Sequence, residues 1–252
     1  MSPVVARALA RLFVLLLAAA TLRLGAKEVG PNVILMLADD VGWGDLGCFG
    51  HPTIRTPHLD DLARRGLKLT SFYSAPSCIP ARIQFLLGRY PGRVNLGVTS
   101  AGGRGGIPDG MPTLAQTLRD AGYSTAMLGK WHLGYAEDRF LPTGRGFESW
   151  YGLPYSNDMV RPWVETDEPL WLYEDHRRVE HPVDLGTLTR RYTERAVEFI
   201  RRKHSRPFFL YFALTAPHEP VSPSAAFRGR SGIAPIADFL METDWAVGEV
   251  LR

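Results

Sequence analysis

Two uninterrupted apolar runs constrain the fold of this chain more than any other feature of its sequence. They read NVILMLADD at residues 32–40 and PFFLYFALTAP at residues 207–217. A strand that is apolar at every position must be buried on both faces, and such strands are typical of a parallel sheet covered by helices. The chain has 252 residues, of which 45% are hydrophobic, so it can bury a full core in one large domain or slightly more.

Strand-like and helix-like segments alternate along most of the chain. A helix after the first run has good end signals, because Thr56 can cap it, Pro57 suits its first position and Gly66 can end it. The alternation predicts an α/β domain with a mostly parallel sheet, whose ligands bind beyond the carboxyl ends of the strands. The remaining expected segments are a strand at 67–74, helices at 80–88 and 112–122, a strand running into a loop at 124–134, and helices at 188–203 and 236–252.

Residues 135–187 interrupt this alternation. The segment is rich in proline, glycine, tryptophan and charged residues, and it shows little periodicity. We expect it to form an ordered surface excursion, because long segments of this kind are often binding loops. Two of its three tryptophans, Trp163 and Trp171, either pack over the edge of the sheet or contact a ligand.

The first 26 residues, MSPVVARALARLFVLLLAAATLRLGA, have the features of a secretory signal peptide. Arg7 and Arg11 precede an apolar run from Leu12 to Ala20, and small residues follow it. The alternative is a membrane anchor, but this run is short, since a helix needs about 20 apolar residues to span a bilayer. We therefore predict an exported protein without a stable membrane span, cleaved between Ala20 and Ala26.

The charge balance of the remaining chain argues against nucleic-acid binding. The full chain has a formal charge of +3, and its first 26 residues contain three arginines and no acidic residue, so the rest is neutral overall. A nucleic-acid protein would keep a basic surplus or a basic stripe.

The sequence also has no Asn-x-Ser/Thr glycosylation site. We expect a periplasmic or secreted protein in a bacterial source, and a lysosomal or extracellular one in a eukaryote.

Charged side chains follow three of the expected buried strands. Asp39 and Asp40 can together hold a hard cation such as Ca²⁺, or they can be solvated loop acids. Lys130 and His132 are two residues apart, so in an extended segment both project to one side, as pocket donors or as surface groups. His218 follows the last apolar run in a proline-flanked loop, where a histidine is either structural or catalytic.

The stretch PSCIPARIQFLLGR at residues 76–89 places one of the two cysteines at the start of an expected helix. Pro80 suits the first turn, so Cys78 would lie at the helix N-terminus, where free N–H groups favour negative charge. Arg82 lies one turn further on and can reach back. An unmodified thiol there would be an activated nucleophile. The alternative is a disulfide between Cys48 and Cys78 in an oxidising compartment.

Four segments, in this order, resemble the type I sulfatases, and most of all their arylsulfatase branch. They are NVILMLADDVGWGDLGCFG, CIPARIQFLLGR, GYSTAMLGKWHLG and PFFLYFALTAPHEP. The most specific element is the CxPxR motif of Cys78, Pro80 and Arg82, and the resemblance covers nearly all of residues 31–252. It implies an alkaline-phosphatase-like α/β fold, a three-layer sandwich around a mostly parallel sheet, with residues 27–252 as the N-terminal part of the catalytic domain.

The resemblance also implies a chemistry for Cys78. In type I sulfatases a formylglycine-generating enzyme converts this cysteine to formylglycine, whose aldehyde hydrates to a geminal diol. One hydroxyl, bound to the metal, attacks the sulfur of a sulfate monoester and expels the alcohol. The other hydroxyl then loses its proton, and return to the aldehyde releases sulfate. A serine or an unconverted thiol has no second hydroxyl, so it would not complete the cycle.

Carried over residue by residue, the resemblance assigns roles to the expected site. Ca²⁺, with Mg²⁺ as the alternative ion, would bind Asp39, Asp40 and the modified Cys78. Arg82 would hold the diol. The residues expected to bind sulfate or assist the chemistry are Lys130, His132, Ser156 as a sulfate contact, and His218 as the proton donor to the leaving oxygen.

Two kinds of departure separate the chain from the family pattern. Ala81 stands where many members have serine, which the pattern tolerates. Leu87 stands where threonine is usual, which would weaken recognition by the converting enzyme.

Members of the family also use a second Asp and Asn pair as metal ligands, and another Lys as a sulfate contact, from a segment downstream of the last expected helix. We therefore expect a chain truncated at its C-terminus, with an incomplete sheet and an under-coordinated metal site.

Two other functions stay open at this point. Related α/β hydrolases use similar metal and anion sites for phosphate or phosphonate monoesters, so the chain would suit such a hydrolase. The missing metal ligands and the tryptophan-bearing excursion would also suit a non-catalytic protein that binds sulfated glycans.

Overall fold

The computed structural model describes residues 30–252, and the predicted signal peptide lies outside them. The described helices and strands belong to one compact unit, Asn32–Arg252. None of these helices is long and apolar enough to cross a membrane.

The strands are β1 (Val33–Asp39), β2 (Ser124–Gly129), β3 (Ser149–Gly152), β4 (Leu172–Glu174), β5 (Arg177–Glu180) and β6 (Phe208–Pro217). The α-helices are α2 (Pro57–Arg65), α3 (Cys78–Leu87), α4 (Leu114–Asp120), α5 (Leu188–Arg201) and α6 (Pro235–Leu251). The 3-10 helices are η1 (Trp43–Asp45), η2 (Gly47–Phe49), η3 (Pro91–Arg93), η4 (Asp138–Phe140), η5 (Pro142–Arg145) and η6 (Leu185–Thr187).

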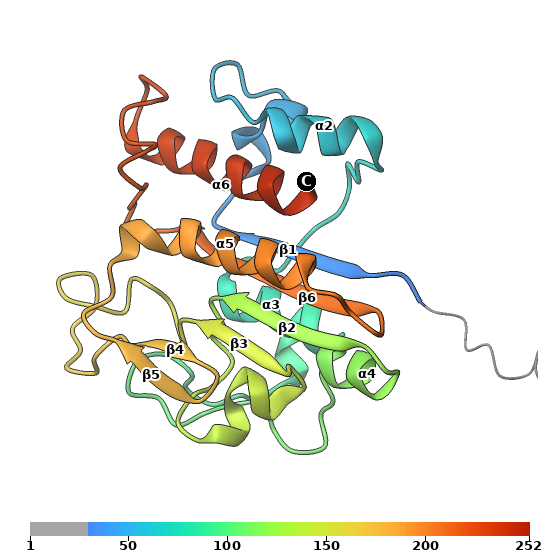
Figure 1. The fold of residues 1–252 in the computed structure, drawn as a ribbon. Helices are drawn as coiled ribbons and strands as arrows, with labels where there is room; N and C mark the ends of the chain where they lie inside the picture. Colours follow the sequence, from blue (N-terminus) through green and yellow to red (C-terminus); the bar gives the residue numbers. More distant parts are fainter. Residues whose placement is uncertain (1–29) are drawn as a thin grey trace, which may run out of the picture. The chain divides into compact units, whose positions relative to one another are not determined.

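The strands form one mixed sheet in the order β1-β6-β2-β3-β4-β5 (Figure 1). β1, β6, β2 and β3 run parallel to one another, whereas β4 and β5 are antiparallel additions at one edge. β6 is buried at every position and pairs with β1 on one side and β2 on the other. The two apolar runs of the sequence are therefore neighbouring strands, which confirms the predicted mostly parallel α/β sheet.

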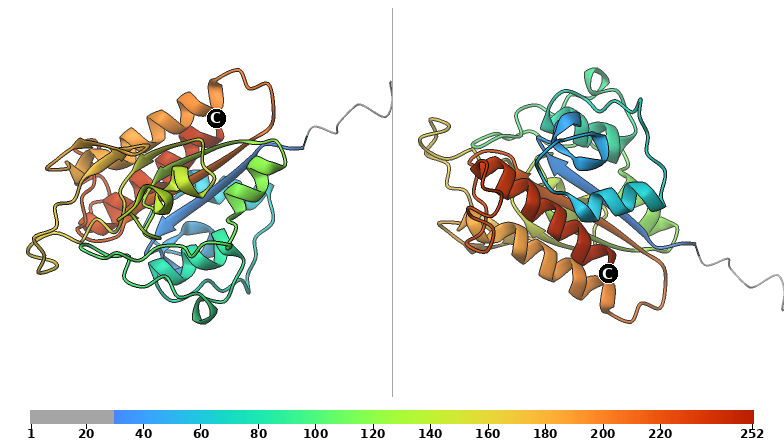
Figure 2. Two further views of the ribbon diagram at one scale, coloured as in Figure 1. Left: turned by 90° about the horizontal axis from the view of Figure 1, so that it is seen from below. Right: turned by 90° about the horizontal axis from the view of Figure 1, so that it is seen from above.

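Helices cover both faces of the sheet, so this unit has three layers. Alternate residues of β6 point to opposite faces. Phe209 and Tyr211 belong to a core shared with α3 and α4, whereas Leu210 and Phe212 belong to a second core shared with α5 and α6. Figure 2 shows α5 and α6 side by side over their face of the sheet. The predicted three-layer sandwich is confirmed.

Helix α2 begins as the sequence predicts, and a distant carboxylate supports its first turn. Thr56 lies at its N-cap position and Pro57 is its first residue, but the Thr56 side chain makes no capping hydrogen bond. Asp244, a buried residue of α6, accepts hydrogen bonds from the backbone N–H groups of His58 at 3.2 Å and Leu59 at 2.8 Å. A polar residue on the buried face of α6 thus satisfies N–H groups that have no partner within α2.

The predicted strand at residues 67–74 is wrong. The segment is irregular, and no described strand pairs with it. Leu67 is 85% exposed and Tyr73 is 87% exposed. Alternating apolar residues do not make a strand by themselves, because the backbone groups of a strand need a partner strand. The segment instead lines one side of an apolar hollow of about 1070 Å³, and α2 lines another side.

The segment at residues 135–187 is more regular than the sequence predicts. It contains β3, β4 and β5, which extend the sheet, and its residues Trp150 and Leu153 are buried. Strands of three or four residues are too short for a period of two to stand out in the sequence. Trp171 packs against the core, and the centroid of its ring lies 4.9 Å from the centroid of the His181 ring. The side chain of Trp163 is half exposed.

The turn after β2 depends on the absence of a side chain at Gly129. Its φ is +108°, and a Cβ there would lie 1.7 Å from the carbonyl oxygen of Ala213 on β6. We expect Gly129→Ala to lower the free energy of unfolding by about 3 kcal/mol or more, because backbone strain and the clash would separate β2 from β6. Urea unfolding followed by circular dichroism measures this loss. The control is Gly44→Ala, since no atom lies within 4 Å of a Cβ at that position. Equal losses in the two variants would contradict the steric explanation.

Candidate active site

The side chains predicted as site residues gather at the carboxyl end of the parallel strands. Asp39 and Asp40 come at the end of β1, Lys130 and His132 follow β2, and His218 follows β6. Because β6 lies between β1 and β2, these three strand ends are adjacent. The arrangement agrees with the rule that open α/β sheets bind ligands beyond the carboxyl ends of their strands.

A buried ion cluster of Asp39, Arg82 and Lys130 lies at the centre of this region. Oδ2 of Asp39 is 2.5 Å from Nζ of Lys130 and 3.2 Å from Nη2 of Arg82, and all three side chains are buried. Burial raises the pKa of Asp39, but Arg82 and Lys130 lower it by more, so its pKa lies below the ordinary value. The carboxylate is therefore ionised, and the buried ion cluster carries a formal charge of +1.

Arg82 reaches the buried ion cluster from α3 as a side chain with no exposed surface. Its Nη1 donates to the carbonyl oxygen of Lys130 at 2.5 Å and to the hydroxyl of Tyr211 at 3.2 Å. Burial lowers the pKa of Arg82, while Tyr211, Asp39 and Cys78 raise it, and the net shift is upward. The guanidinium is thus a fixed positive charge that also anchors the loop after β2.

Lys130 links the buried ion cluster to the segment after β3. Its Nζ donates to Oγ of Ser156 at 2.8 Å, and both side chains are buried. An ammonium group has three N–H donors. Asp39 and Ser156 take two of them, so the third is available to a bound anion.

His132 is buried beside these charges. Neither of its ring nitrogens has a hydrogen-bond partner among the described residues. Burial, followed by the charges of Lys130 and Arg82, lowers the pKa of His132 well below the ordinary value. The imidazole is therefore neutral near pH 7, and one of its nitrogens can donate a hydrogen bond to an oxyanion.

His218 faces Asp40 across the end of the sheet. Its Nε2 lies 3.4 Å from Oδ2 of Asp40, and its Nδ1 lies 2.6 Å from the carbonyl oxygen of Glu219. A carbonyl only accepts hydrogen bonds, so Nδ1 carries the hydrogen and Nε2 is the nitrogen that faces the site. The carboxylate of Asp40 is 64% exposed, so its pairing with His218 is weak.

Two site residues have left-handed backbone conformations, although neither is glycine. Asp40 has a φ of +65° and His132 a φ of +62°. Such conformations cost on the order of 1–3 kcal/mol each and are concentrated at functional sites. The backbone at both strand ends is therefore bent in a way that only the surrounding structure can maintain.

Cys78 is the first residue of α3, and Ser77 is its N-cap. The predicted position of this cysteine at a helix N-terminus is confirmed, although the helix begins two residues before Pro80. The thiol is half-buried, next to N–H groups that have no partner within the helix. Cys48 and Cys78 are both free thiols, so the alternative of a disulfide between them is not found.

The described residues provide only part of a calcium site. Ca²⁺ takes six to eight oxygen ligands. Within residues 30–252, no three side chains of His, Cys, Asp or Glu come together as a metal-binding group. Asp39 and Asp40 can offer carboxylate oxygens, but Oδ2 of Asp39 is already held by Lys130 and Arg82. By themselves, these side chains do not fit a complete Ca²⁺ site.

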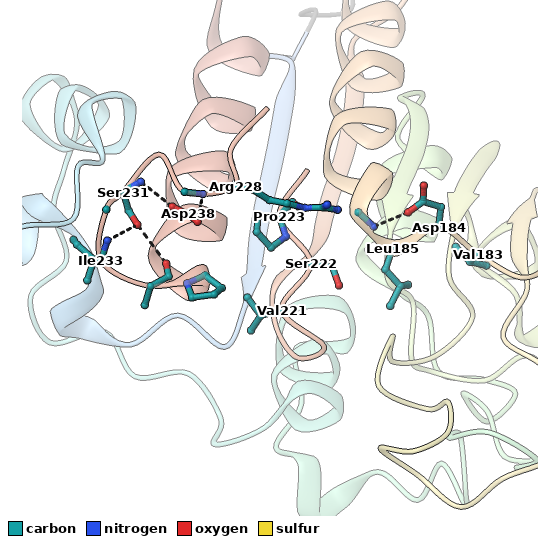
Figure 3. Close-up of a pocket in the computed structure, with 15 residues that line it drawn as sticks. Val183, Asp184, Leu185, Val221, Ser222, Pro223, Arg228, Ser231, Ile233 and Asp238 are labelled. Atoms are coloured by element: carbon teal, nitrogen blue, oxygen red, sulfur yellow. Dashed lines mark hydrogen bonds between the residues drawn. The ribbon is translucent and has the colours of Figure 1, made fainter. Parts of the chain in front are cut away.

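A separate hollow of about 730 Å³ lies beside the loop that follows β6 (Figure 3). It is lined by residues that precede α5, follow β6 and precede α6. Its carboxylates, Asp184 and Asp238, accept hydrogen bonds from the backbone N–H groups of Gly186 and Ser231, respectively. No residue of the buried ion cluster lines this hollow, so we place the candidate active site at the strand ends.

Two residues that shape the site lie outside the sequence predictions. Tyr211 accepts a hydrogen bond from Arg82, and Asn157 donates to the carbonyl oxygens of His218 and Glu219. Tyr211 lies in a fully apolar run, where nothing distinguishes it from the other core aromatic residues. Asn157 follows a predicted sulfate contact in the sequence PYSND, and this adjacency is the only signal that could have identified it.

Comparisons with known proteins point to one family. The Sulfatase family model matches residues 31–252. N-acetylgalactosamine-6-sulfatase from Canis lupus familiaris is 40% identical over 273 residues, covering 100% of this chain and 52% of that protein. Arylsulfatase A from Homo sapiens is 40% identical over 242 residues, covering 88% of this chain and 48% of that protein. The chain thus spans about half the length of the curated relatives it matches.

Solved structures agree with this result. The PsFucS1 sulfatase from Pseudoalteromonas sp. has a TM-score of 0.76 and 29% identity, covering 88% of this chain and 51% of that one. A structure from work on glycosaminoglycan metabolism by Bacteroides thetaiotaomicron has a TM-score of 0.77 and 27% identity, covering 89% and 59%. A third, in complex with its substrate D-glucosamine-2-N,6-O-disulfate, has a TM-score of 0.60 and 25% identity, covering 80% and 37%.

Proposed function

Because this chain belongs to the sulfatase family, we propose that the protein hydrolyses sulfate monoesters at the carboxyl end of its parallel strands. The position of Cys78 carries the proposal. This residue opens α3, and Arg82, one turn later on the same helix, reaches the buried ion cluster. A reactive group at Cys78 would therefore act beside a fixed positive charge and a helix N-terminus, both of which stabilise a developing negative charge.

The buried ion cluster is complementary in charge to a sulfate monoester. A sulfate monoester carries one negative charge, and the cluster carries a formal +1 from Arg82, Lys130 and ionised Asp39.

The neighbouring side chains have distinct roles in this proposal. Lys130 would bind a sulfate oxygen with its third N–H group, and neutral His132 would donate a hydrogen bond to another. Ser156 accepts from Lys130 and still has its own O–H to donate to the same anion. His218, in its protonated form, would give the Nε2 proton to the leaving alcohol oxygen.

The proposal includes a modified nucleophile and a metal ion. A formylglycine formed from Cys78 by a formylglycine-generating enzyme would supply, as its hydrate, one hydroxyl for attack on sulfur and a second for sulfate release. Ca²⁺, or Mg²⁺ in its place, would be held in part by Asp39 and Asp40 and would add positive charge against the sulfate oxygens.

The wider setting of the activity is also part of the proposal. The relatives named above support sulfated sugars as the substrate class. Residues 1–26 would direct export and be removed, which leaves residues 27–252 as the N-terminal part of the catalytic domain. The mature protein would then act in the periplasm or outside the cell in a bacterium, and in the lysosome or outside the cell in a eukaryote.

The test compares the kcat/KM values for p-nitrophenyl sulfate and p-nitrophenyl phosphate, using protein produced together with a formylglycine-generating enzyme. We expect a preference for the sulfate ester on the order of a hundredfold or more, because the chain belongs to the sulfatase family and its curated relatives are sulfatases. A preference for phosphate would overturn the proposal in favour of a phosphate or phosphonate monoester hydrolase. Binding of a sulfated sugar without turnover of either ester would instead favour a non-catalytic glycan-binding protein.

A further inference from the structure

Asn157 connects the segment after β3 to the loop that carries His218. Its side chain is 3% exposed, and its Nδ2 donates to the carbonyl oxygen of Glu219 at 2.8 Å and to that of His218 at 3.4 Å. A side-chain amide nitrogen has two hydrogens, so both are used on this loop. The reversed amide would place Oδ1 against two carbonyl oxygens, so the contacts themselves decide the orientation of the group.

The carbonyl group of Glu219 joins Asn157 to the ring of His218. Its oxygen lies 2.8 Å from Nδ2 of Asn157 and 2.6 Å from Nδ1 of His218. A carbonyl oxygen has two lone pairs, and these two donors occupy both of them. Asn157 thereby holds the carbonyl in the direction that accepts from the imidazole.

We propose that Asn157 is a positioning residue that fixes the tautomer and the direction of the His218 ring through the carbonyl group of Glu219. With the hydrogen held on Nδ1, the ring presents Nε2 toward Asp40 and the buried ion cluster. The link to catalysis depends on the proposed function, in which the protonated ring gives up its Nε2 proton and is left as the neutral Nδ1–H tautomer. The tautomer itself does not depend on that function.

No other described side chain provides this restraint. Within residues 30–252, the His218 ring makes one hydrogen bond, to the carbonyl of Glu219, and its contact with Asp40 is a 3.4 Å approach to an exposed carboxylate. Without the amide of Asn157, the Glu219–Pro220 peptide group, which carries this carbonyl, would be free to turn toward solvent. The two neutral tautomers of the ring would then both be populated.

The direct test is the ring tautomer of His218, read from long-range ¹H–¹⁵N correlation spectra of uniformly ¹⁵N-labelled protein at a pH where the ring is neutral. The spectrum of His218→Gln identifies the His218 signals among the seven histidines of the sequence. We expect the Nδ1–H tautomer alone in the unaltered protein and a mixture of both tautomers in Asn157→Ala. Asn95→Ala, which removes an amide from a remote loop, is the control and should leave the His218 signals unchanged.

Asn157→Leu repeats the test with a side chain of similar size, and it keeps the test decisive if the alanine variant does not fold. Leucine has no hydrogen-bond donor to give to Glu219, so the same mixture of tautomers is expected. A His218 ring that stays entirely in the Nδ1–H form in the folded variants would overturn the proposal, whether or not the protein hydrolyses sulfate esters.

The kinetic consequence is separate from the spectroscopic one. For p-nitrophenyl sulfate, we expect Asn157→Ala to lower kcat on the order of tenfold, with KM changed by less than about twofold, because a misdirected proton donor affects the chemical step and not substrate binding. A change of tautomer together with an unchanged kcat would contradict the proposed role of His218 in catalysis. It would leave the positioning by Asn157 intact.

Discussion

Replacing Cys78 with alanine is expected to lower the turnover of an aryl sulfate by at least about 10³-fold. The proposed nucleophile derives from this side chain alone, and alanine offers no oxygen or sulfur at the N-terminus of α3. Steady-state rates with p-nitrophenyl sulfate measure the effect. Cys78→Ser is expected to be equally inactive in turnover, because serine has one hydroxyl where the proposed chemistry uses two.

The matched control for this prediction is Cys48→Ala. Cys48 is the other free cysteine, and it lines the apolar hollow beside α2, away from the buried ion cluster. Its replacement should leave turnover within about twofold of the original rate. If Cys78→Ala kept the original rate, Cys78 would have no part in catalysis.

Removing the guanidinium of Arg82 is expected to have the largest effect on stability. Arg82→Ala leaves Asp39 with Lys130 as its one remaining ion-pair partner among the described residues, and it removes hydrogen bonds to the backbone of Lys130 and to Tyr211. Breaking a buried ion pair from one side typically costs about 3–5 kcal/mol of unfolding free energy. Urea unfolding followed by tryptophan fluorescence measures this loss.

Two further variants make the Arg82 result specific. Arg82→Lys keeps the charge but loses the planar fork that reaches three acceptors, so we expect it to recover only a minor part of the stability. Arg89→Ala removes an exposed arginine just after α3 and should change stability by less than about 0.5 kcal/mol. If Arg82→Ala lost no more stability than Arg89→Ala, the buried ion cluster would not support the fold.

Continuous apolar runs made the centre of the fold predictable. β6 is apolar along its length because helices cover both faces of the sheet, and this burial leaves a strong signal in the sequence. β1 carries the same signal, but it lies at the edge of the described sheet, and six of its seven residues are only partly buried. The bounds of α2 were predictable from local signals, since Pro57 is its first residue and Gly66 follows its last, although the first N–H groups are satisfied by the distant Asp244. Parallel pairing brings the polar residues at the strand ends to one edge of the sheet, whereas the strand order itself was not predicted.

Features that depend on distant partners were not predictable. Residues 67–74 alternate like a strand, but pairing is decided by a neighbouring strand and not by the segment itself. The hydroxyl of Tyr211 matters because Arg82 arrives from another helix, and the amide of Asn157 matters because the His218 loop lies against it. These contacts join residues that are 129 and 62 positions apart, so no local pattern reports them.

The central claim is that sulfate-ester hydrolysis depends on conversion of Cys78 at the N-terminus of α3. The most direct measurement plots the rate of p-nitrophenyl sulfate hydrolysis against the fraction of Cys78 converted to formylglycine. That fraction is read by mass spectrometry of the Cys78 peptide in preparations made with increasing amounts of the converting enzyme. Our account predicts a straight line through the origin. A rate that stays the same as the converted fraction falls to zero would contradict it.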